Sequence, residues 1–281
     1  MKRTFPCPLC ADAGFRTVHT RGKWRYLACR GCGLVRIDPM PRADQALACY
    51  DDYLPGRPDR IALWEEMMRR VVRESAHLIE AHSPLAPARV LDVGCGYGFF
   101  AGEMKARGWD VVGVEPSPEG REHTARRYGI PVHKKPLEEL DLEPGSFQVV
   151  TLFYVIEHVT DPLGLLRKVR DILVPGGVLL LRWPHSTPIV RILGPLARLL
   201  DLYHTPYHLY DFSPSTMKRL LATAGLTHME TRPGAPTKPP KRFDRWSASL
   251  FGRTAQALWV ISGKKLLFPG VSKTTLASNP M

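Results

Sequence analysis

A glycine-rich turn between a buried strand and a helix places the strongest constraint on this chain. Residues 89–93 form a short, mostly apolar run and residues 99–107 follow a helical pattern, so Gly94, Gly96 and Gly98 fall at a strand-to-helix turn. Glycines can adopt positive φ and let a ligand approach the backbone, and the next helix offers unpaired N–H groups to an anionic group. The chain is therefore expected to bind a ligand at this end of an open α/β sheet.

Glu115 indicates which kind of ligand this is. It lies 21 residues after Gly94 (115 − 94), at the end of the next expected strand, residues 109–115. A carboxylate at that position can accept hydrogen bonds from both hydroxyls of a ribose. The glycine spacing is G-x-G-x-G, and Phe99 occupies the third glycine of the dinucleotide fingerprint G-x-G-x-x-G. These residues favour a nucleoside with an anionic arm and argue against NAD or FAD.

The stretch from Val90 to Gly98 resembles motif I of class I S-adenosylmethionine-dependent methyltransferases, with Glu115 at the acidic ribose-binding position. The resemblance covers about residues 88–232. It implies an α/β fold with a Rossmann-like seven-stranded methyltransferase sheet, and S-adenosylmethionine as cofactor. The candidate cofactor-binding residues are Asp92, Gly94, Cys95, Gly96, Gly98, Glu115, Leu137 and Phe153.

Residues 153–162 resemble a segment of small-molecule methyltransferases related to the quinone-biosynthesis O-methyltransferases, in which a Glu-His pair faces donor and acceptor. On this chain the pair is Glu157 and His158. Some of those enzymes carry a further Glu three residues earlier that helps to hold a divalent ion. Tyr154 occupies that position here, so no catalytic metal is carried over.

Methyl transfer to an oxygen or nitrogen requires a base, and histidine has a pKa suited to that role. Histidines expected on the ligand face are His158, His185, His204 and His208. The candidate catalytic residues are His158 and His208 first, together with Glu157 and His185.

Two Cys-x-x-Cys pairs near the N-terminus predict a structural zinc site. Eighteen residues separate the pairs, a spacing typical of four-cysteine zinc sites. Disulfides are the alternative, which a cytosolic setting disfavours. Alternating residues 15–19 and 24–28 predict two short strands and hence a zinc ribbon. The expected zinc ligands are Cys7, Cys10, Cys29 and Cys32.

The remaining pattern divides the chain into a ribbon (1–38), a linker and helix (39–83), a methyltransferase domain (84–263) and a weakly ordered tail (264–281). Within the second segment, the linker contains Tyr50–Tyr53 and the helix covers residues 60–82. Residues 257–262 are expected to form the last strand of the sheet. An insertion at 188–203 predicts an amphipathic helix. It is expected to act as a lid on the acceptor side, and the alternative is that it lies on a membrane.

The net charge suggests an anionic partner without identifying it. Lys and Arg outnumber Asp and Glu by 39 − 27 = +12 over 281 residues, which suits nucleic acid, a phospholipid surface or a phosphorylated substrate, or only a basic soluble surface. No apolar run approaches the about 18 residues of a spanning helix, and the first residues lack the apolar segment of a signal peptide. A cytoplasmic protein is expected, and the oligomeric state is left open.

The leading hypothesis is an S-adenosylmethionine-dependent methyltransferase acting on a small or carrier-linked acceptor such as a sugar, polyketide or lipid-linked metabolite. Its layout resembles that of sugar methyltransferases with an N-terminal zinc ribbon. Two alternatives are an rRNA methyltransferase that binds RNA through the ribbon, and a non-catalytic zinc-ribbon adaptor. Against RNA, no aromatic and basic stripe for a single strand is evident.

Overall fold

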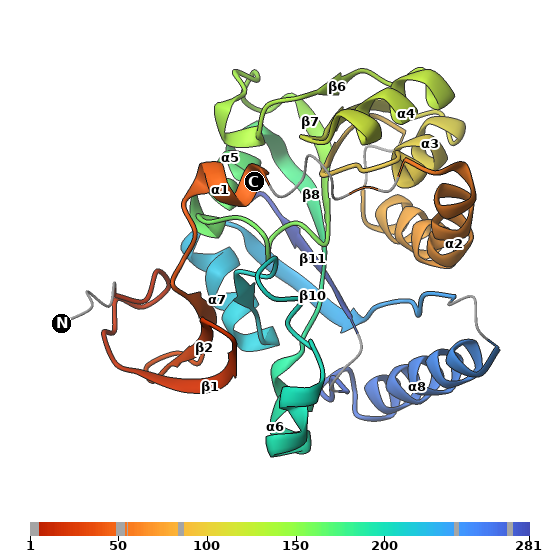
Figure 1. Ribbon diagram of the computed structural model, residues 1–281. Helices are drawn as coiled ribbons and strands as arrows, with labels where there is room; N and C mark the ends of the chain where they lie inside the picture. Colours follow the sequence, from red (N-terminus) through yellow and green to blue (C-terminus); the bar gives the residue numbers. More distant parts are fainter. Residues whose placement is uncertain (1–5, 49–53, 55, 84–86, 239–241, 269–271) are drawn as a thin grey trace.

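A seven-stranded mixed sheet with helices on both faces forms the body of the protein (Figure 1). The structure, a computed structural model, describes residues 6–48, 54, 56–83, 87–238, 242–268 and 272–281. The strand order is β10-β11-β8-β7-β4-β5-β6, with β11 antiparallel to both neighbours and the other pairs parallel. The strands are β4 (Arg89–Val93), β5 (Asp110–Val114), β6 (Val132–His133), β7 (Phe147–Phe153), β8 (Leu173–Trp183), β10 (Thr227–Pro233) and β11 (Lys273–Ser278). This topology confirms the predicted methyltransferase sheet.

Each face of the sheet buries its own core, because successive strand residues point to opposite faces. In β4, Val90 packs with Phe100 and Met104 of α3, whereas Leu91 packs in the other cluster with Leu165 and Leu166 of α5. The helices that cover the sheet are α2 (Pro58–His82), α3 (Phe99–Ala106), α4 (Pro118–Tyr128), α5 (Pro162–Ile172) and α7 (Pro214–Thr223). The sequence pattern predicted α2 and α3 within a few residues.

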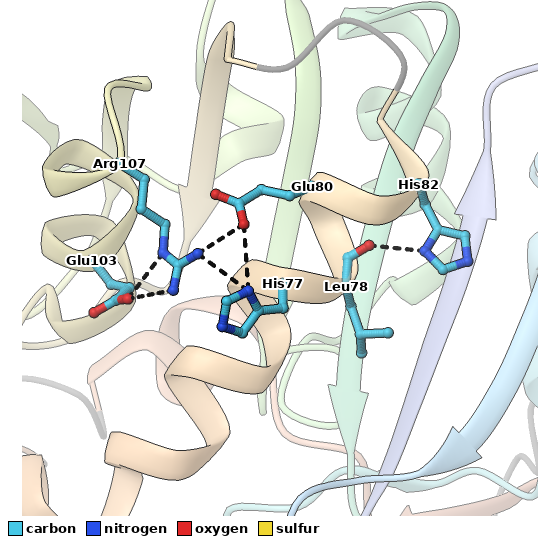
Figure 2. A network of polar contacts seen from close by, with 6 residues as sticks. All are labelled: His77, Leu78, Glu80, His82, Glu103 and Arg107. Atoms are coloured by element: carbon cyan, nitrogen blue, oxygen red, sulfur yellow. Dashed lines mark hydrogen bonds and ion pairs between the residues drawn. The ribbon is translucent and has the colours of Figure 1, made fainter.

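Helix α2 precedes the sheet in the chain, and a polar network joins it to the end of α3 (Figure 2). The guanidinium of Arg107, at the end of α3, donates to Glu80 of α2 over 2.7 Å and to Glu103 over 2.8 Å. Val71, Val72, Ala76 and Ile79 bury the inner face of α2. Helix α2 is thus held in place beside the glycine turn.

The predicted ribbon forms, and it is joined to the main domain through a shared second sheet. This sheet contains the ribbon strands β1 (Phe15–Arg21), β2 (Trp24–Cys29) and β3 (Val35–Asp38). Its fourth strand is β9 (Tyr210–Asp211), which pairs with β3 and follows β8 in the chain. Sequence reasoning missed β3 and its pairing with β9. The hydroxyl of Tyr26 on β2 also donates to the carbonyl of His208 over 3.2 Å. The ribbon therefore forms part of the wall around His208.

The C-terminal expectations were wrong in two places. Residues 257–261 belong to helix α8 (Arg242–Ile261) and Ser262 to the turn after it, so this segment is not a strand. The strand is instead β11, within the tail expected to be weakly ordered, where it lies between β8 and β10. In the linker, residues 43–48 form a short helix, α1 (Ala43–Ala48). The Tyr50–Tyr53 stretch lies outside the described residues.

The segment after β8 contains a short helix, α6 (Thr187–Leu193), followed by the 3₁₀ helix η2 (Gly194–Leu199). A second 3₁₀ helix, η1 (Leu137–Glu139), follows β6. Among the described helices, none combines the length and the apolar character needed to cross a bilayer.

Candidate functional site

The glycine turn has the predicted backbone conformation. Gly94, Gly96 and Gly98 have φ of +71°, +54° and +74°, the left-handed region that favours glycine. A Cβ placed on Gly98 would lie 2.5 Å from the Oγ1 of Thr124, so Thr124 occupies the space beside Gly98 and leaves no room there for a ligand. A Cβ on Gly96 would meet no atom within 4 Å. Gly96 therefore presents bare backbone to open space.

Glu115 closes the other side of this turn. The residue is only 5% exposed, and its carboxylate accepts from the backbone N–H of Gly96 and of Ser117, each over 2.8 Å. Burial raises the pKa of Glu115, and the two backbone hydrogen bonds oppose that rise. Each carboxylate oxygen has a second lone pair. Glu115 can thus hold the glycine turn and still accept from a ligand hydroxyl.

Asp92 lies at the end of β4, beside the turn. Its carboxyl accepts from the hydroxyl of Thr151 on β7 over 2.7 Å, and burial raises its pKa to about 7. A carboxyl in this state gains a charge readily when a cation binds beside it.

A cavity of about 1030 Å³ runs from the turn toward the ribbon side. Asp92, Gly94, Cys95, Gly96, Glu115, Leu137 and Phe153 all line it; Gly98 does not, consistent with its contact with Thr124. Its walls are largely apolar, and Trp64, Met67 and Met68 of α2 and Leu202 contribute to them. The cavity thus offers a largely apolar space beside the predicted nucleoside site.

Two of the predicted catalytic histidines meet because of a backbone pairing that joins distant segments. The carbonyl of Glu157 accepts from the N–H of Leu209 over 2.7 Å and from that of Tyr210 over 3.2 Å. This pairing brings the rings of His158 and His208 to 4.8 Å, centre to centre, in an edge-to-face arrangement. Both line the cavity.

The tautomer of His158 follows from its partner. The Nδ1 of His158 lies 2.9 Å from the carbonyl oxygen of Tyr207, which can only accept, so Nδ1 carries the hydrogen. The lone pair of the neutral ring is then on Nε2. Burial lowers the pKa of His158 to about 4 and lowers that of His208 further, so both rings are neutral near pH 7.

Glu157 lies next to the two histidines. It is fully buried, neither carboxyl oxygen has a hydrogen-bond partner among the described residues, and burial raises its pKa to about 8. Its carboxyl is near the Nε2 of His158, at 3.9 Å. Glu157, His158 and His208 offer ligand atoms within 4.8 Å of one another and could together hold a metal ion.

His185 does not join this group. It is partly buried and is not among the residues that line the cavity, although Pro184 and Ser186 on either side are. Sequence reasoning missed another polar group at the cavity. The Nε of Arg182 donates to the hydroxyl of Tyr154 over 2.7 Å, and that hydroxyl donates to Ser272 over 3.1 Å. The available signal was an arginine inside the apolar run of β8.

The four ribbon cysteines converge on one point. The sulfurs of Cys7 and Cys32 lie 3.6 Å apart, and those of Cys10 and Cys29 lie 3.5 Å apart. These separations are too long for disulfides. They approach the roughly 3.8 Å between sulfurs that share a tetrahedral ion at about 2.3 Å. The cluster fits the predicted four-cysteine ribbon and could bind zinc.

Comparisons with known proteins point to methyltransferases. A family model described as a methyltransferase domain matches residues 63–231. The ubiquinone biosynthesis O-methyltransferase of Xanthomonas campestris pv. campestris is 36% identical over 160 residues, which cover 53% of this chain and 66% of the relative. That of Acinetobacter baumannii is 34% identical over 158 residues, 52% of this chain and 66% of the relative. The matches thus span just under two thirds of these relatives.

Solved structures agree on the fold. A Burkholderia thailandensis 1,6-didemethyltoxoflavin-N1-methyltransferase, with 1,6-didemethyltoxoflavin and S-adenosylhomocysteine bound, superposes with a TM-score of 0.59 at 17% identity, covering 94% of this chain and 98% of that one. A geranyl diphosphate methyltransferase gives a TM-score of 0.53 at 17% identity, covering 74% and 78%. At such identities the likeness concerns the fold alone.

Proposed function

Since this chain belongs to the class I methyltransferase family, we propose that it transfers a methyl group from S-adenosylmethionine to a small or carrier-linked acceptor, at an oxygen, nitrogen or carbon atom. The observation that carries the proposal is the Glu115 carboxylate. It is buried beside an open glycine backbone at one end of a large cavity. A sugar, polyketide or lipid-linked metabolite remains the proposed acceptor class.

Each part of the cofactor has a suitable partner in this arrangement. The bare backbone at Gly96 would receive the amino-acid end, and Glu115 would accept from the ribose hydroxyls. Asp92 would face the positive charge of the amino group. Leu137 and Phe153 would supply apolar contacts, as both line the cavity.

The acceptor would bind between the sulfonium methyl and the histidine pair. For an oxygen acceptor, a lone pair on that oxygen forms the new bond to the methyl carbon while the bond from sulfur to methyl breaks, leaving S-adenosylhomocysteine. The Nε2 of His158, which carries the lone pair, would take the hydroxyl proton. His208, edge to face with it, would help to orient the acceptor.

Neutral groups suit this chemistry. The sulfonium is a cation, and neutral imidazoles do not repel it as protonated ones would. The largely apolar walls of the cavity exclude water and favour an acceptor with an apolar portion. This composition supports a metabolite more than a polyanionic nucleic acid.

We also propose that Cys7, Cys10, Cys29 and Cys32 hold a structural zinc ion. Four thiolates close the tetrahedron and leave no position for a substrate. The ion would stabilise the ribbon, which shares a sheet with β9 and thereby supports the segment that carries His208. Zinc in this role would stabilise the part of the cavity that contains His208 and would not contact the methyl donor.

The test is isothermal calorimetry of the purified protein with S-adenosylmethionine, followed by total RNA at two salt concentrations. We expect cofactor binding, loss of most of it in Glu115→Ala, and unchanged binding in the control Glu122→Ala, which alters an exposed carboxylate on the neighbouring helix α4. Absence of cofactor binding would favour the adaptor alternative. Steeply salt-dependent RNA binding would favour the rRNA alternative.

A further inference from the structure

Two insertions leave the sheet side by side at the edge where the cavity lies. Trp183, the last residue of β8, pairs with Lys273 at the start of β11, and Lys273 pairs with Pro233 at the end of β10. The first insertion, residues 188–203, contains most of α6 and all of η2. The second, residues 234–272, connects β10 to β11 and contains α8. Figure 1 shows α6 and α8 projecting at the same end of the molecule.

The second insertion is far longer than the connection requires. Antiparallel neighbouring strands need a loop of about 2–5 residues, whereas 272 − 233 = 39 residues join β10 to β11 here. A connection of this length with its own helix is expected to serve a function beyond joining the strands.

Helix α8 presents apolar residues to solvent. Gly252, Ala255 and Trp259 bury one side of the helix. On the opposite side, eleven residues apart and therefore at helical spacing, Leu250 is 47% exposed and Ile261 is 83% exposed. An amphipathic helix normally turns its apolar stripe inward. In α8 such a stripe faces outward instead.

The first insertion shows the same arrangement. Packing as a lid accounts for Val190 and Ala197, which are buried, but Ile192 remains 75% exposed and Leu199 80% exposed. Nine of the thirteen large, exposed hydrophobic side chains among the described residues belong to the two insertions. These nine are Ile192, Leu196, Leu199, Leu200, Leu250, Phe251, Val260, Ile261 and Leu266. The clustering exceeds the scatter that is normal on a protein surface.

Both insertions are basic. The first contains two arginines and one Asp, 2 − 1 = +1; the second contains seven Lys and Arg and one Asp, 7 − 1 = +6. Together they carry a net charge of +7. Exposed cations that flank the apolar residues include Arg191, Arg253 and Lys265.

We propose that the two insertions form a docking surface for a lipid membrane with anionic head groups. Exposed aliphatic and aromatic side chains bordered by Lys and Arg are the composition that enters the boundary between head groups and acyl chains. A second copy of the chain would bring two positively charged faces together, which opposes self-association through this surface. Charge complementarity therefore favours the anionic bilayer.

The proposal goes beyond methyl transfer and connects with it at the roots of the insertions. Pro184 and Ser186 precede the first insertion, Thr237 and Ser272 lie in the second, and all four line the cavity. If the proposed function holds, an acceptor with an apolar tail would pass from the bilayer into the cavity between the two insertions.

The test is flotation of the full chain with vesicles of phosphatidylcholine alone and of an equimolar mixture of phosphatidylcholine and phosphatidylglycerol. We expect binding to the anionic vesicles that weakens as salt rises, and little binding to the neutral ones. The double variants Leu250→Glu with Ile261→Glu, and Ile192→Glu with Leu199→Glu, should each reduce binding by roughly tenfold or more, because each removes apolar insertion and adds negative charge.

The matched control is Leu63→Glu with Met229→Glu, which adds the same charge at exposed apolar positions outside both insertions. It should bind vesicles nearly as well as the natural chain. Far-ultraviolet circular dichroism and cofactor titration establish that each variant is folded. Equal binding to neutral and anionic vesicles, equal loss in the control, or a dimer seen by light scattering that the insertion variants dissolve would each overturn the proposal. None of these readouts depends on methyl transfer.

Discussion

Two glycines of the same turn provide a matched pair of substitutions, Gly96→Ala and Gly98→Ala. Both residues have positive φ, so an added Cβ carries the same backbone penalty of roughly 1–2 kcal/mol at each. They differ in what the Cβ meets. At Gly98 it would lie 2.5 Å from Thr124 Oγ1 and 2.7 Å from Thr124 Cγ2, whereas at Gly96 it would meet no atom within 4 Å.

The energies follow from this difference. Gly96→Ala should lower the free energy of unfolding by only the backbone term. Gly98→Ala should add an overpacking cost of about 1–3 kcal/mol, for a total of roughly 2–5 kcal/mol. At about 2–4 °C per kcal/mol for a domain of this size, the Gly98 variant should unfold several degrees below the Gly96 variant.

Ligand binding should show the reverse order. The methyl of Gly96→Ala projects into the space where the cofactor would approach the backbone, so cofactor affinity should fall by more than about tenfold, or 1.4 kcal/mol. The folded fraction of Gly98→Ala should keep most of its affinity, because its Cβ points at Thr124.

Thermal unfolding and calorimetry with S-adenosylmethionine, performed below the transition of both variants, measure the two effects separately. Normal cofactor affinity in a folded Gly96→Ala protein would refute the reasoning, because it would mean that no ligand approaches this stretch of backbone. Equal unfolding temperatures for the two variants would contradict the assigned role of the Thr124 contact.

Three further predictions concern the carboxyl beside the turn, the proposed base and the ribbon. The pKa of Asp92 is raised to about 7, and a bound cation favours its ionised form. Cofactor affinity should therefore weaken by up to about tenfold per pH unit below pH 7. Calorimetry across pH should show this pH dependence, and Asp92→Asn should abolish it. His158→Gln should lower kcat by about 10²–10⁴ without altering cofactor affinity, and a change in affinity alone would exclude His158 as the base. Tyr26→Phe, which loses the hydrogen bond to His208, should cost about 0.5–1.5 kcal/mol of stability and raise the KM for the acceptor only; removal of zinc by a chelator, followed by metal analysis, should act in the same direction.

Local features of the site were predictable from the sequence, whereas features that depend on distant contacts were not. The turn at Gly94–Gly98 and the position of Glu115 follow from short-range rules of strand, turn and helix. The meeting of His158 and His208 depends on backbone hydrogen bonds from Leu209 and Tyr210 to Glu157, which no short-range pattern encodes.

The C-terminal error has a similar cause. Residues 257–262 are apolar in succession, a pattern that a buried strand and a helix share. The helix forms around the buried residues Gly252, Ala255 and Trp259, whose spacing is helical. The true strand, β11, begins with a lysine and two threonines and reads as polar. It is buried nonetheless, and the ammonium of Lys273 donates to the carbonyl of Phe268 over 2.8 Å.

The pairing of β3 with β9 has a consequence for how the protein acquires its shape. Val35 pairs with Asp211, so 211 − 35 = 176 residues separate the two partners. Contacts of such long sequence separation form late, because the entropy of closing the loop is lost before the contact is gained. The cysteines would therefore bind metal before β3 pairs with β9. The part of the cavity that contains His158 and His208 would be among the last to form.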